Sequence, residues 1–428
     1  MTTVIRNGHV VDPASGLDGR GWIHVKDRSI VGAGLGEPPA SLRPDETIEA
    51  HGWIVAPGFV DLHTHLREPG QESSETIESG CRAAVAGGFT SVVCMPNTLP
   101  PIDHASIVKF VHLEAQRVNL AQVFPVGTVS RGREGKELAD IGELVAAGVV
   151  GISDDGNPVA DAGLMRNALE YTRMFSIPVI DHCEDPQLSN AGVMNEGFYS
   201  TKLGLRGTPA VCEDVMVARD LLLAEYTGGR LHLAHISTRQ AVRMIRDAKR
   251  RGVTVTCEVT PHHLALTEAA LCDYDTRFKM SPPLRTEEDR QALIEGLRDG
   301  TIDAIATDHA PHTDTDKNLE FDYAANGVIG LESALPVAYT LLVKNNGMPL
   351  ARLIEVLSCA PAKIIGQQQK GSLRAGADAD IVIWDPAAQF KLDVNNFKSK
   401  ARNCPFDGWD VAGAVVRTIV GGETKFSR

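Results

Sequence analysis

The feature that most constrains the fold is an alternation of short apolar segments with amphipathic ones, repeated until about residue 366. Eight segments have the composition of strands, at 54–63, 91–95, 122–126, 148–152, 178–182, 231–235, 253–259 and 304–307. Stretches with helical spacing lie between them, at 75–86, 163–174, 213–226, 239–250 and 287–298. This pattern is typical of parallel α/β architecture, and eight strands favour a closed (β/α)8 barrel of the TIM type. An open doubly wound sheet is the alternative, but no glycine-rich phosphate loop follows the first strand.

Both ends of the chain have a different pattern, with short alternating runs separated by glycine, proline and aspartate. Examples are Ile23-His24-Val25 near the start and the runs 379–384 and 415–420 near the end. Such runs are typical of small β-structure. Because chain ends often lie close together, we expect one β-rich domain built from residues 1–56 and 367–428, beside a barrel formed by residues 57–366.

The charge balance excludes several classes of partner. The 428 residues include 42 basic and 55 acidic side chains, which gives a formal charge of −13. This charge opposes binding to nucleic acid and to anionic membranes. No segment approaches the ~20 apolar residues of a membrane span, and no secretory signal pattern begins the chain, so we expect a cytoplasmic protein. Eight cysteines without a CxxC pair indicate buried, reduced thiols.

Side chains suited to bind a metal recur where the expected strands end. The ends of strands one, four, five, six and eight carry Asp61 to His65, Ser153 to Asp155, Asp181 with His182, His235, and Thr307 with Asp308. In a (β/α)8 barrel these ends meet at one face, where active sites form. His63 and His65 are two residues apart on a strand, so they can reach one metal together. A single HxH pair is weak evidence for a metal site, but imidazole and carboxylate groups from several strands together favour zinc.

Here the sequence resembles a known family. The segment 56–70 reads APGFVDLHTHLREPG and is similar to the opening motif of dihydroorotases in the amidohydrolase superfamily. The segment 306–312, ATDHAPH, resembles their closing signature. Shorter matches lie between them, at 95–98 (MPNT), 153–156 (SDDG), 181–185 (DHCED) and 235–238 (HIST). The resemblance therefore spans nearly the whole chain.

The resemblance implies a set of metal ligands. It assigns His63, His65 and Asp308 to one metal, and His182 and His235 to a second. Many relatives, including hydantoinases and allantoinases, bridge the metals with a carboxylated lysine at the end of strand four, but no lysine lies there in this chain. We therefore expect Asp155 to form the bridge, as in aspartate-bridged (type I) dihydroorotases, and Asp154 to cap the turn. A short aspartate bridge leaves open whether the chain holds one zinc or two.

The implied substrate is dihydroorotate, in exchange with N-carbamoyl-aspartate. Arg67 follows the HxH pair closely, and its guanidinium can hold a carboxylate through two charge-assisted hydrogen bonds. Further substrate contacts are expected from Asn97, Ser281, His312, Asn326 and Gly327, the last two through their backbone. Two positions depart from the family pattern: Ser281 replaces an asparagine, and Asn326 stands where an aromatic residue is common.

The expected reaction is the reversible cyclisation of N-carbamoyl-L-aspartate to L-dihydroorotate with loss of water, in pyrimidine biosynthesis. A zinc-bound hydroxide attacks the ring carbonyl in the hydrolytic direction, and Asp308 acts as general base and then as general acid. The alternatives are a hydantoinase or allantoinase, and a non-catalytic scaffold for aspartate transcarbamoylase. A homodimer and a complex with aspartate transcarbamoylase are compatible with the resemblance.

Other histidines are expected to have structural roles. His262 and His263 follow strand seven, and we expect them to support the site rather than bind metal. His232 points to the opposite side of its strand from His235, which predicts packing or solvent contact.

Overall fold

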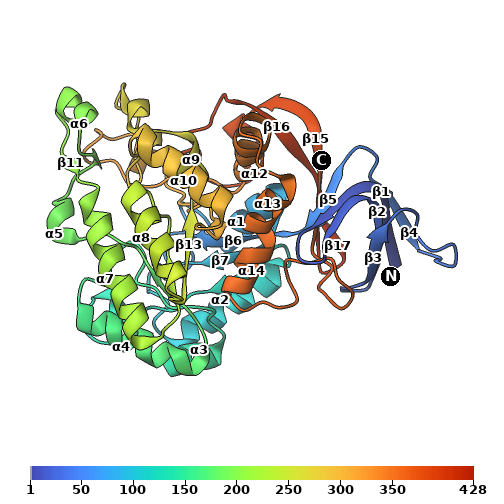
Figure 1. Cartoon of the computed structure of the whole chain (residues 1–428), viewed down its shortest axis with the longest axis horizontal. Coiled ribbons are helices and arrows are strands. Elements are labelled where there is room, and N and C mark those ends of the chain that lie inside the picture. The colour runs from blue at the N-terminus through green and yellow to red at the C-terminus, as the bar shows by residue number, and fades with distance from the viewer. Residues whose placement is uncertain (1) are drawn as a thin grey trace.

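The computed structural model describes residues 2–428 and places an α/β barrel beside a β-sheet that both ends of the chain form (Figure 1). Seven strands line the barrel: β6 (Phe59–Thr64), β7 (Phe89–Cys94), β8 (Gln122–Pro125), β9 (Val179–Asp181), β12 (Leu231–Leu233), β13 (Val255–Val259) and β14 (Ala304–Ile305). They pair in parallel as β6-β7-β8 and as β9-β12-β13-β14. A parallel bridge between Thr64 and His309 closes the ring, so the barrel prediction is confirmed.

The segment at the fourth barrel position, expected as a strand over 148–152, makes fewer ladder hydrogen bonds than a full strand. Only Ile152 makes regular bridges, to Gly127 on one side and to Val179 on the other. On either side of this segment, the carbonyls of Pro125 and Pro178 accept hydrogen bonds from Val150 and Ile152. Proline has no N–H group, so neither residue can donate a ladder hydrogen bond back to the segment. The missing donors leave a ladder that is too sparse for a full strand, although the segment keeps its place in the ring.

The first expected strand, 54–63, is divided at Gly58. Residues Ile54–Pro57 (β5) join the terminal sheet, and only β6 enters the barrel. A side chain at Gly58 would lie 2.2 Å from Thr90, so only glycine permits this close approach. The division gives the barrel a strand that starts next to the terminal sheet.

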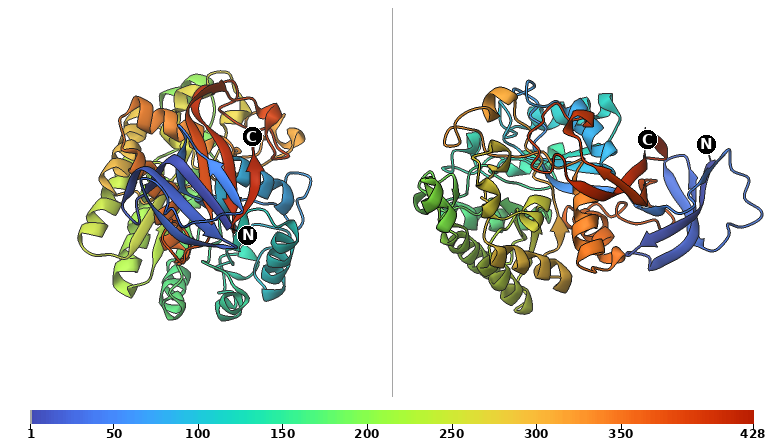
Figure 2. Two further views of the ribbon diagram at one scale, coloured as in Figure 1. Left: turned by 90° about the vertical axis from the view of Figure 1, so that its right-hand side faces the viewer. Right: turned by 90° about the horizontal axis from the view of Figure 1, so that it is seen from above.

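The terminal sheet has eight strands in the order β17-β16-β15-β5-β1-β2-β3, with β4 paired to β1. Their bounds are β1 Thr2–Asp12, β2 Leu17–Lys26, β3 Ser29–Leu35, β4 Glu46–Glu49, β15 Ile381–Lys391, β16 Asp410–Val420 and β17 Glu423–Ser427. Both ends of the chain lie on this sheet, with three strands between β17 and β1 (Figure 2). A sheet from both termini was expected, whereas the domain boundaries at 56/57 and 366/367 stay predictions.

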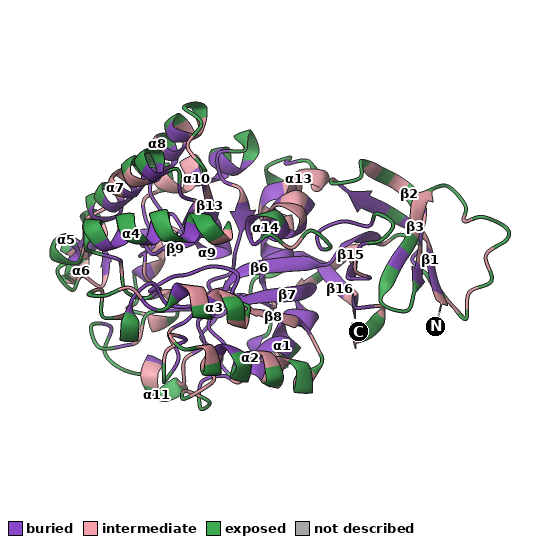
Figure 3. Cartoon of the chain, turned by 90° about the horizontal axis from the view of Figure 1, so that it is seen from below, coloured by how far each residue is buried: buried purple, intermediate pink, exposed green. Residues whose placement is uncertain are grey.

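The helices cover the outside of the barrel. The longer ones are α1 Ile77–Ala86, α2 Ala105–Val118, α3 Ile141–Ala147, α4 Ala162–Thr172, α7 Val211–Thr227, α8 Arg239–Arg250 and α10 Glu287–Asp299. Shorter elements are α5 Pro186–Ser189, β10 Met194–Asn195, α6 Phe198–Leu203, β11 Gly207–Thr208, α9 Pro261–Ala265, α11 Asp314–Lys317, α12 Ala334–Ala338, α13 Leu350–Ile354 and α14 Ala360–Ile364. All five predicted helices are present within three residues of the expected ends, because their apolar faces pack on the strands (Figure 3).

Apolar side chains from successive strands meet inside the ring. The cluster includes Val60, Val93, Val126, Ile180 and Ala304, all buried. A packed interior supports the strand ends above it. None of the helices in residues 2–428 is long and apolar enough to cross a membrane. The cysteines are free thiols, six of them buried.

Candidate active site

A cavity of about 290 Å³ opens where the barrel strands end. All six residues expected to contact substrate line it: Arg67, Asn97, Ser281, His312, Asn326 and Gly327. Five of the six expected metal ligands line it as well, namely His65, Asp155, His182, His235 and Asp308. The sixth, His63, is fully buried and contacts Asp155. The structure therefore brings the two predicted groups of residues to one place.

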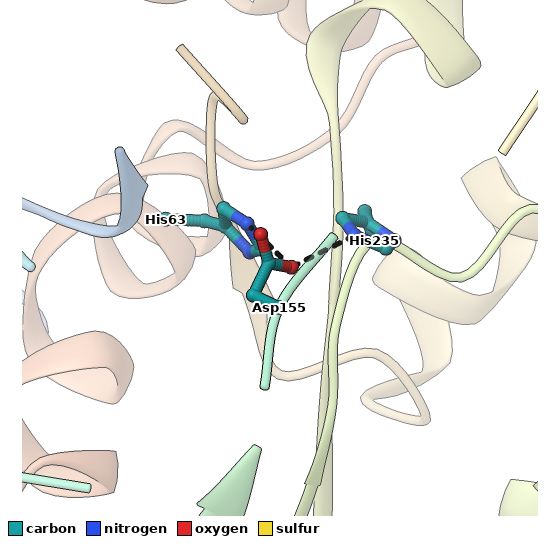
Figure 4. A group of neighbouring side chains, drawn as sticks. All are labelled: His63, Asp155 and His235. Atoms are coloured by element: carbon teal, nitrogen blue, oxygen red, sulfur yellow. Dashed lines mark ion pairs between the residues drawn. The ribbon is translucent and has the colours of Figure 1, made fainter. Parts of the chain in front are cut away.

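The floor of the cavity holds two clusters of ligand atoms. His63, His65 and Asp308 form one cluster, and His63, Asp155 and His235 form the other. Asp155 Oδ1 lies 3.2 Å from His63 Nε2 and 3.8 Å from His235 Nε2, so its carboxylate sits between the two rings (Figure 4). Asp308 Oδ1 lies 3.0 Å from His65 Nε2.

The donor atoms of this floor fit a divalent cation. Within residues 2–428, His63 Nε2, Asp155 Oδ1 and His235 Nδ1 are buried polar atoms without a hydrogen-bond partner. A buried polar atom without a partner costs roughly 1–3 kcal/mol. Two of these atoms, His63 Nε2 and Asp155 Oδ1, lie 3.2 Å apart and are explained by a cation that they bind, and nitrogen with carboxylate oxygen suits a transition metal.

His182 lies beside the second cluster. Its Nδ1 is 3.0 Å from His235 Nε2, while its Nε2 is 3.6 Å from Glu184 Oε2. Both rings can therefore turn a nitrogen toward the same point. This arrangement is compatible with a second ion held by His182 and His235.

The two aspartates of the floor are ionised. Burial opposes the charge of Asp155, but the adjacent His63 and His235 outweigh it and hold the pKa of this carboxyl well below its usual range. Burial also opposes the charge of Asp308, and the hydrogen bond from His65 lowers the pKa of Asp308 in the same way. Both groups are thus available as anionic ligands.

Asp154 has a different role from Asp155. Its carboxylate accepts hydrogen bonds from the N–H groups of Val129 and Ser130, at 2.9 and 3.1 Å, and from the Ser130 hydroxyl. It therefore fixes the loop at residues 129–130, which follows β8, instead of capping its own turn as expected.

Glu258 is a functional residue that the motifs did not reveal. It lies on β13, is 1% exposed, and accepts hydrogen bonds from His63 Nδ1 at 2.9 Å and from His232 Nε2 at 3.1 Å. Burial opposes its charge, but these two hydrogen bonds lower the pKa of Glu258 to about 2. The carboxylate fixes the His63 ring with Nε2 toward Asp155. His232, for which packing or solvent was expected, is buried and acts through Glu258.

Asn97 also contacts an expected metal ligand, His65. Its Oδ1 lies 2.8 Å from His65 Nδ1, so it accepts the ring N–H and leaves Nε2 to face Asp308. A substrate contact by Asn97 would use the amide nitrogen.

The rim of the cavity carries positive charge. Arg67 Nε donates to the Pro311 carbonyl at 3.1 Å, and Arg67 Nη2 lies 3.3 Å from His312 Nε2. His312 Nε2 lies 2.7 Å from the Asn326 carbonyl, to which it donates. Burial, together with the charge of Arg67, lowers the pKa of His312 to about 3. His312 is therefore neutral, and the net positive charge of the rim comes from Arg67.

A negatively charged group, Glu184, lies beside Ser281 in the same cavity. The Ser281 hydroxyl donates to Glu184 Oε2 at 2.9 Å. Burial opposes the charge of Glu184, but its bonds with His182 and nearby hydroxyls lower the pKa of this group to about 2. The cavity thus has a cationic rim at Arg67 and an anionic group at Glu184.

The backbone contact expected from Gly327 is already used within the protein. The Gly327 N–H donates to the Lys279 carbonyl at 3.0 Å, and the Gly327 carbonyl accepts from Lys317 Nζ and Asn403 Nδ2, both at 3.0 Å. Lys317 is 5% exposed and also donates to the Ala325 carbonyl at 2.8 Å. These bonds anchor the segment that carries His312 and Gly327, so a substrate contact at Gly327 would replace an existing bond.

His262 and His263 are buried beside the barrel rather than in either cluster. His263 bonds to Thr260 Oγ1 and to the Pro282 carbonyl, at 2.7 and 3.0 Å. His263 therefore holds the segment that leads to Ser281.

Comparison with known proteins agrees with this geometry. The model of the Amidohydrolase family matches residues 54–425. Among solved structures, L-hydantoinase (dihydropyrimidinase) from Arthrobacter aurescens superposes with a TM-score of 0.89 at 28% identity and covers 99% of this chain and 95% of its own. Dihydropyrimidinase from Brevibacillus agri superposes with a TM-score of 0.86 at 25% identity, with the same coverage. The barrel and the histidine and carboxylate clusters define a metal-dependent enzyme of the amidohydrolase class.

Full-length sequence relatives narrow this class. Dihydroorotase of Syntrophus aciditrophicus is 50% identical over 428 residues, which cover 100% of this chain and 99% of the relative. Dihydroorotase of Acetivibrio thermocellus is 49% identical over 98% of this chain and 97% of the relative. The chain belongs to the dihydroorotase family of amidohydrolases.

Proposed function

We propose that the protein catalyses the reversible ring closure of N-carbamoyl-L-aspartate to L-dihydroorotate, with loss of water, in pyrimidine biosynthesis. The observation that carries this proposal is the position of Arg67 in the rim of a cavity whose floor is built from two ligand clusters. Dihydroorotate carries a carboxylate on its ring, and a guanidinium can pair with that group through two hydrogen bonds. The full-length relatives named dihydroorotase support the same activity.

We assign zinc to the floor of the cavity, with one or two ions per chain. One ion would be held by His63, His65 and Asp308, a second by His182 and His235, and Asp155 would bridge them. A bound zinc supplies a coordinated water of lowered pKa and polarises a carbonyl oxygen. The donor set and its unpaired atoms support the assignment.

The chain's own residues orient the substrate and move a proton. Arg67 holds the carboxylate, and the Asn97 amide nitrogen and His312 fix the ring beside it. Asp308 Oδ1 faces His65, which leaves Oδ2 to accept a proton from the attacking water and to deliver it to the departing ring nitrogen. In the biosynthetic direction the same atom takes the proton from the ureido nitrogen.

A hydantoinase is the nearest alternative, since solved hydantoinases share the fold. Hydantoin and allantoin carry no carboxylate, so the Arg67 guanidinium would face their rings without an anionic partner. The segment 153–156 also lacks the lysine of lysine-bridged relatives. A non-catalytic scaffold for aspartate transcarbamoylase is opposed by the presence of all six expected ligands.

The deciding experiment combines metal analysis with a substrate panel. The purified chain is assayed for zinc content and for hydrolysis of dihydroorotate, hydantoin and allantoin in parallel. We expect zinc and turnover of dihydroorotate alone. Turnover of hydantoin without dihydroorotate would overturn the proposal, and zinc binding without any turnover would favour the scaffold.

Three further assignments rest on the sequence. A homodimer, a complex with aspartate transcarbamoylase and a cytoplasmic location stay predictions. Sedimentation of the chain alone and of a mixture with aspartate transcarbamoylase tests the first two, and cell fractionation tests the third.

A further inference from the structure

A second cavity lies at the end of the barrel opposite the active site. Its volume is about 800 Å³, against about 290 Å³ for the active-site cavity. Val150, Ile177 and Arg230 line one side, where the fourth, fifth and sixth barrel positions begin. Residues of the segment 363–374 line the other side, next to helix α14, which lies between the barrel and the terminal sheet (Figure 1, Figure 3). Active sites of such barrels form at the other ends of the strands, so a ligand here would not contact the metal clusters.

The lining of this second cavity is strongly basic. Among residues 2–428 it includes four cationic side chains and no aspartate or glutamate; the four are Arg230, Lys363, Lys370 and Arg374. The lining of the active-site cavity, by comparison, includes three acidic residues. Four cations gathered without a carboxylate are unexpected in a chain whose formal charge is −13. An anionic ligand would account for them.

Lys370 differs from the other three cations because it has acidic partners. Its Nζ lies 2.9 Å from an oxygen of Asp378 and 2.7 Å from an oxygen of Asp380, and the side chain is buried. The other three side chains form no ion pair within the part of the chain that the structure describes. We call Arg230, Lys363 and Arg374 the three free cations. Their charge is available to a ligand.

Carbonyl groups hold two of the three free cations in place. Arg230 Nη2 donates to the Ile364 carbonyl at 2.8 Å, and Arg230 Nη1 donates to the Ser176 carbonyl. Arg374 Nη2 donates to the Gln368 carbonyl at 2.7 Å. These acceptors are uncharged, and burial lowers the pKa of Arg230 with no carboxylate to offset it. An arginine fixed in this way loses little conformational freedom when it binds an oxyanion.

We propose that this second cavity binds a nucleoside triphosphate, with the phosphate groups at the three free cations. Guanidinium and ammonium groups bind phosphate oxygens through charge-assisted hydrogen bonds, and three cations suit the several negative charges of a triphosphate. The cavity is larger than a phosphate group needs and falls within the roughly 300–1,000 Å³ of small-molecule sites. Phe175, Ile177 and Ile365 add an apolar wall on which a base can pack. Long nucleic acids are disfavoured by the negative charge of the whole chain.

The first test is titration calorimetry of the metal-loaded full chain with ATP, in a buffer that contains Mg²⁺. An equilibrated excess of dihydroorotate and N-carbamoyl-aspartate fills the active site, so that ATP does not bind at Arg67. We expect a dissociation constant below about 1 mM for ATP, a value at least about tenfold higher for pyrophosphate, and no detectable binding of adenosine. No binding of ATP at about 5 mM, or equal affinity for adenosine or pyrophosphate, would overturn the proposal.

The second test reverses single charges of the cavity. K363E and R374E alter exposed side chains, and K109E is the matched control, because Lys109 is exposed on α2, outside the cavity, and forms no ion pair within residues 2–428. We expect ATP to bind at least about tenfold more weakly to K363E and to R374E, since each loses a charge-assisted hydrogen bond. K109E should bind ATP like the wild type, and the circular dichroism spectra should be identical. Wild-type affinity in both cavity variants would contradict the proposal.

The third test locates the bound ligand by thiol protection. Ser176 is exposed and lines the cavity, so S176C places a thiol there, while the exposed Cys272 lies outside the cavity and serves as the internal control. Alkylation at position 176 should slow about tenfold at an ATP concentration of about ten times the dissociation constant, because only the free fraction reacts. Alkylation of Cys272 should not change. Binding of ATP without protection at position 176, or with equal protection of both thiols, would place the ligand elsewhere and refute the site.

Discussion

Replacement of Glu258 by glutamine should weaken metal binding without unfolding the barrel. The carboxylate accepts one hydrogen bond from His63 and one from His232, and it is 1% exposed. Glutamine has the same shape and can still accept from His63, while its NH2 group faces a His232 ring that can change tautomer by donating to Thr256. The variant therefore keeps its packing and loses the negative charge behind His63.

Loss of such a partner typically lowers metal affinity 10–100-fold, or about 1.4–2.7 kcal/mol. E258A removes both acceptors and leaves two buried ring nitrogens, His63 Nδ1 and His232 Nε2, unpaired, at roughly 1–3 kcal/mol each, so its unfolding free energy should fall by about 2–5 kcal/mol.

The assay is competition of the protein with a chelator for zinc, followed by thermal unfolding of the metal-free proteins. The matched control is D12N, because Asp12 is equally buried but lies in the terminal sheet, where it accepts from Ser372 and Leu373. D12N should lower stability and leave metal affinity unchanged. If E258Q binds zinc as tightly as the wild type, Glu258 does not act through His63 and the reasoning is wrong.

Four further results are expected. D308A should abolish turnover with an unchanged circular dichroism spectrum, since the proton acceptor is removed; wild-type activity would refute its role. K317M should raise KM about tenfold with kcat changed less, because the anchored segment carries His312, and an unchanged KM would contradict this. Burial raises the pKa of Glu332 to about 7, so the stabilising effect of its protonated form is complete below about pH 4.5 and is lost as the pH rises to 7. The melting temperature of the wild type relative to E332Q should therefore fall over that range, and a constant difference would exclude the shift. Removal of metal by a chelator should lower the melting temperature, and zinc should restore it; an unchanged value would argue against the metal centre.

The sequence was informative where local pattern and barrel geometry agree. Helix α8 begins at Arg239 and ends at Arg250, as its spacing predicts, because Thr238 caps its first turn and one face is apolar. That the expected ligands lie together was predictable for a related reason: parallel strands of a closed barrel end at one face, so polar side chains at those ends must meet.

The supporting residues could not be predicted in the same way. His63 and Glu258 are 195 residues apart, and only the closed barrel brings them together. A glutamate inside the apolar run of 253–259 was the available signal, because a buried carboxylate needs a partner. Lys317 gave no signal, since it stands in the polar run Asp314 to Asn318 and is buried only by the fold of the whole loop.

Closure of the barrel and assembly of the metal centre depend on the same contact. The carboxylate of Asp61, on the first strand, accepts from the Thr307 N–H at 3.0 Å and from the His63 N–H at 3.2 Å, and it is fully buried. It thereby joins the first strand to the last at the level just before His63 and Asp308. The ligands of the floor come from strands that adjoin only in the closed ring, so an open chain presents no comparable cluster. A metal that binds there stabilises the closed ring by its whole binding free energy, because the unfolded chain competes for it only weakly.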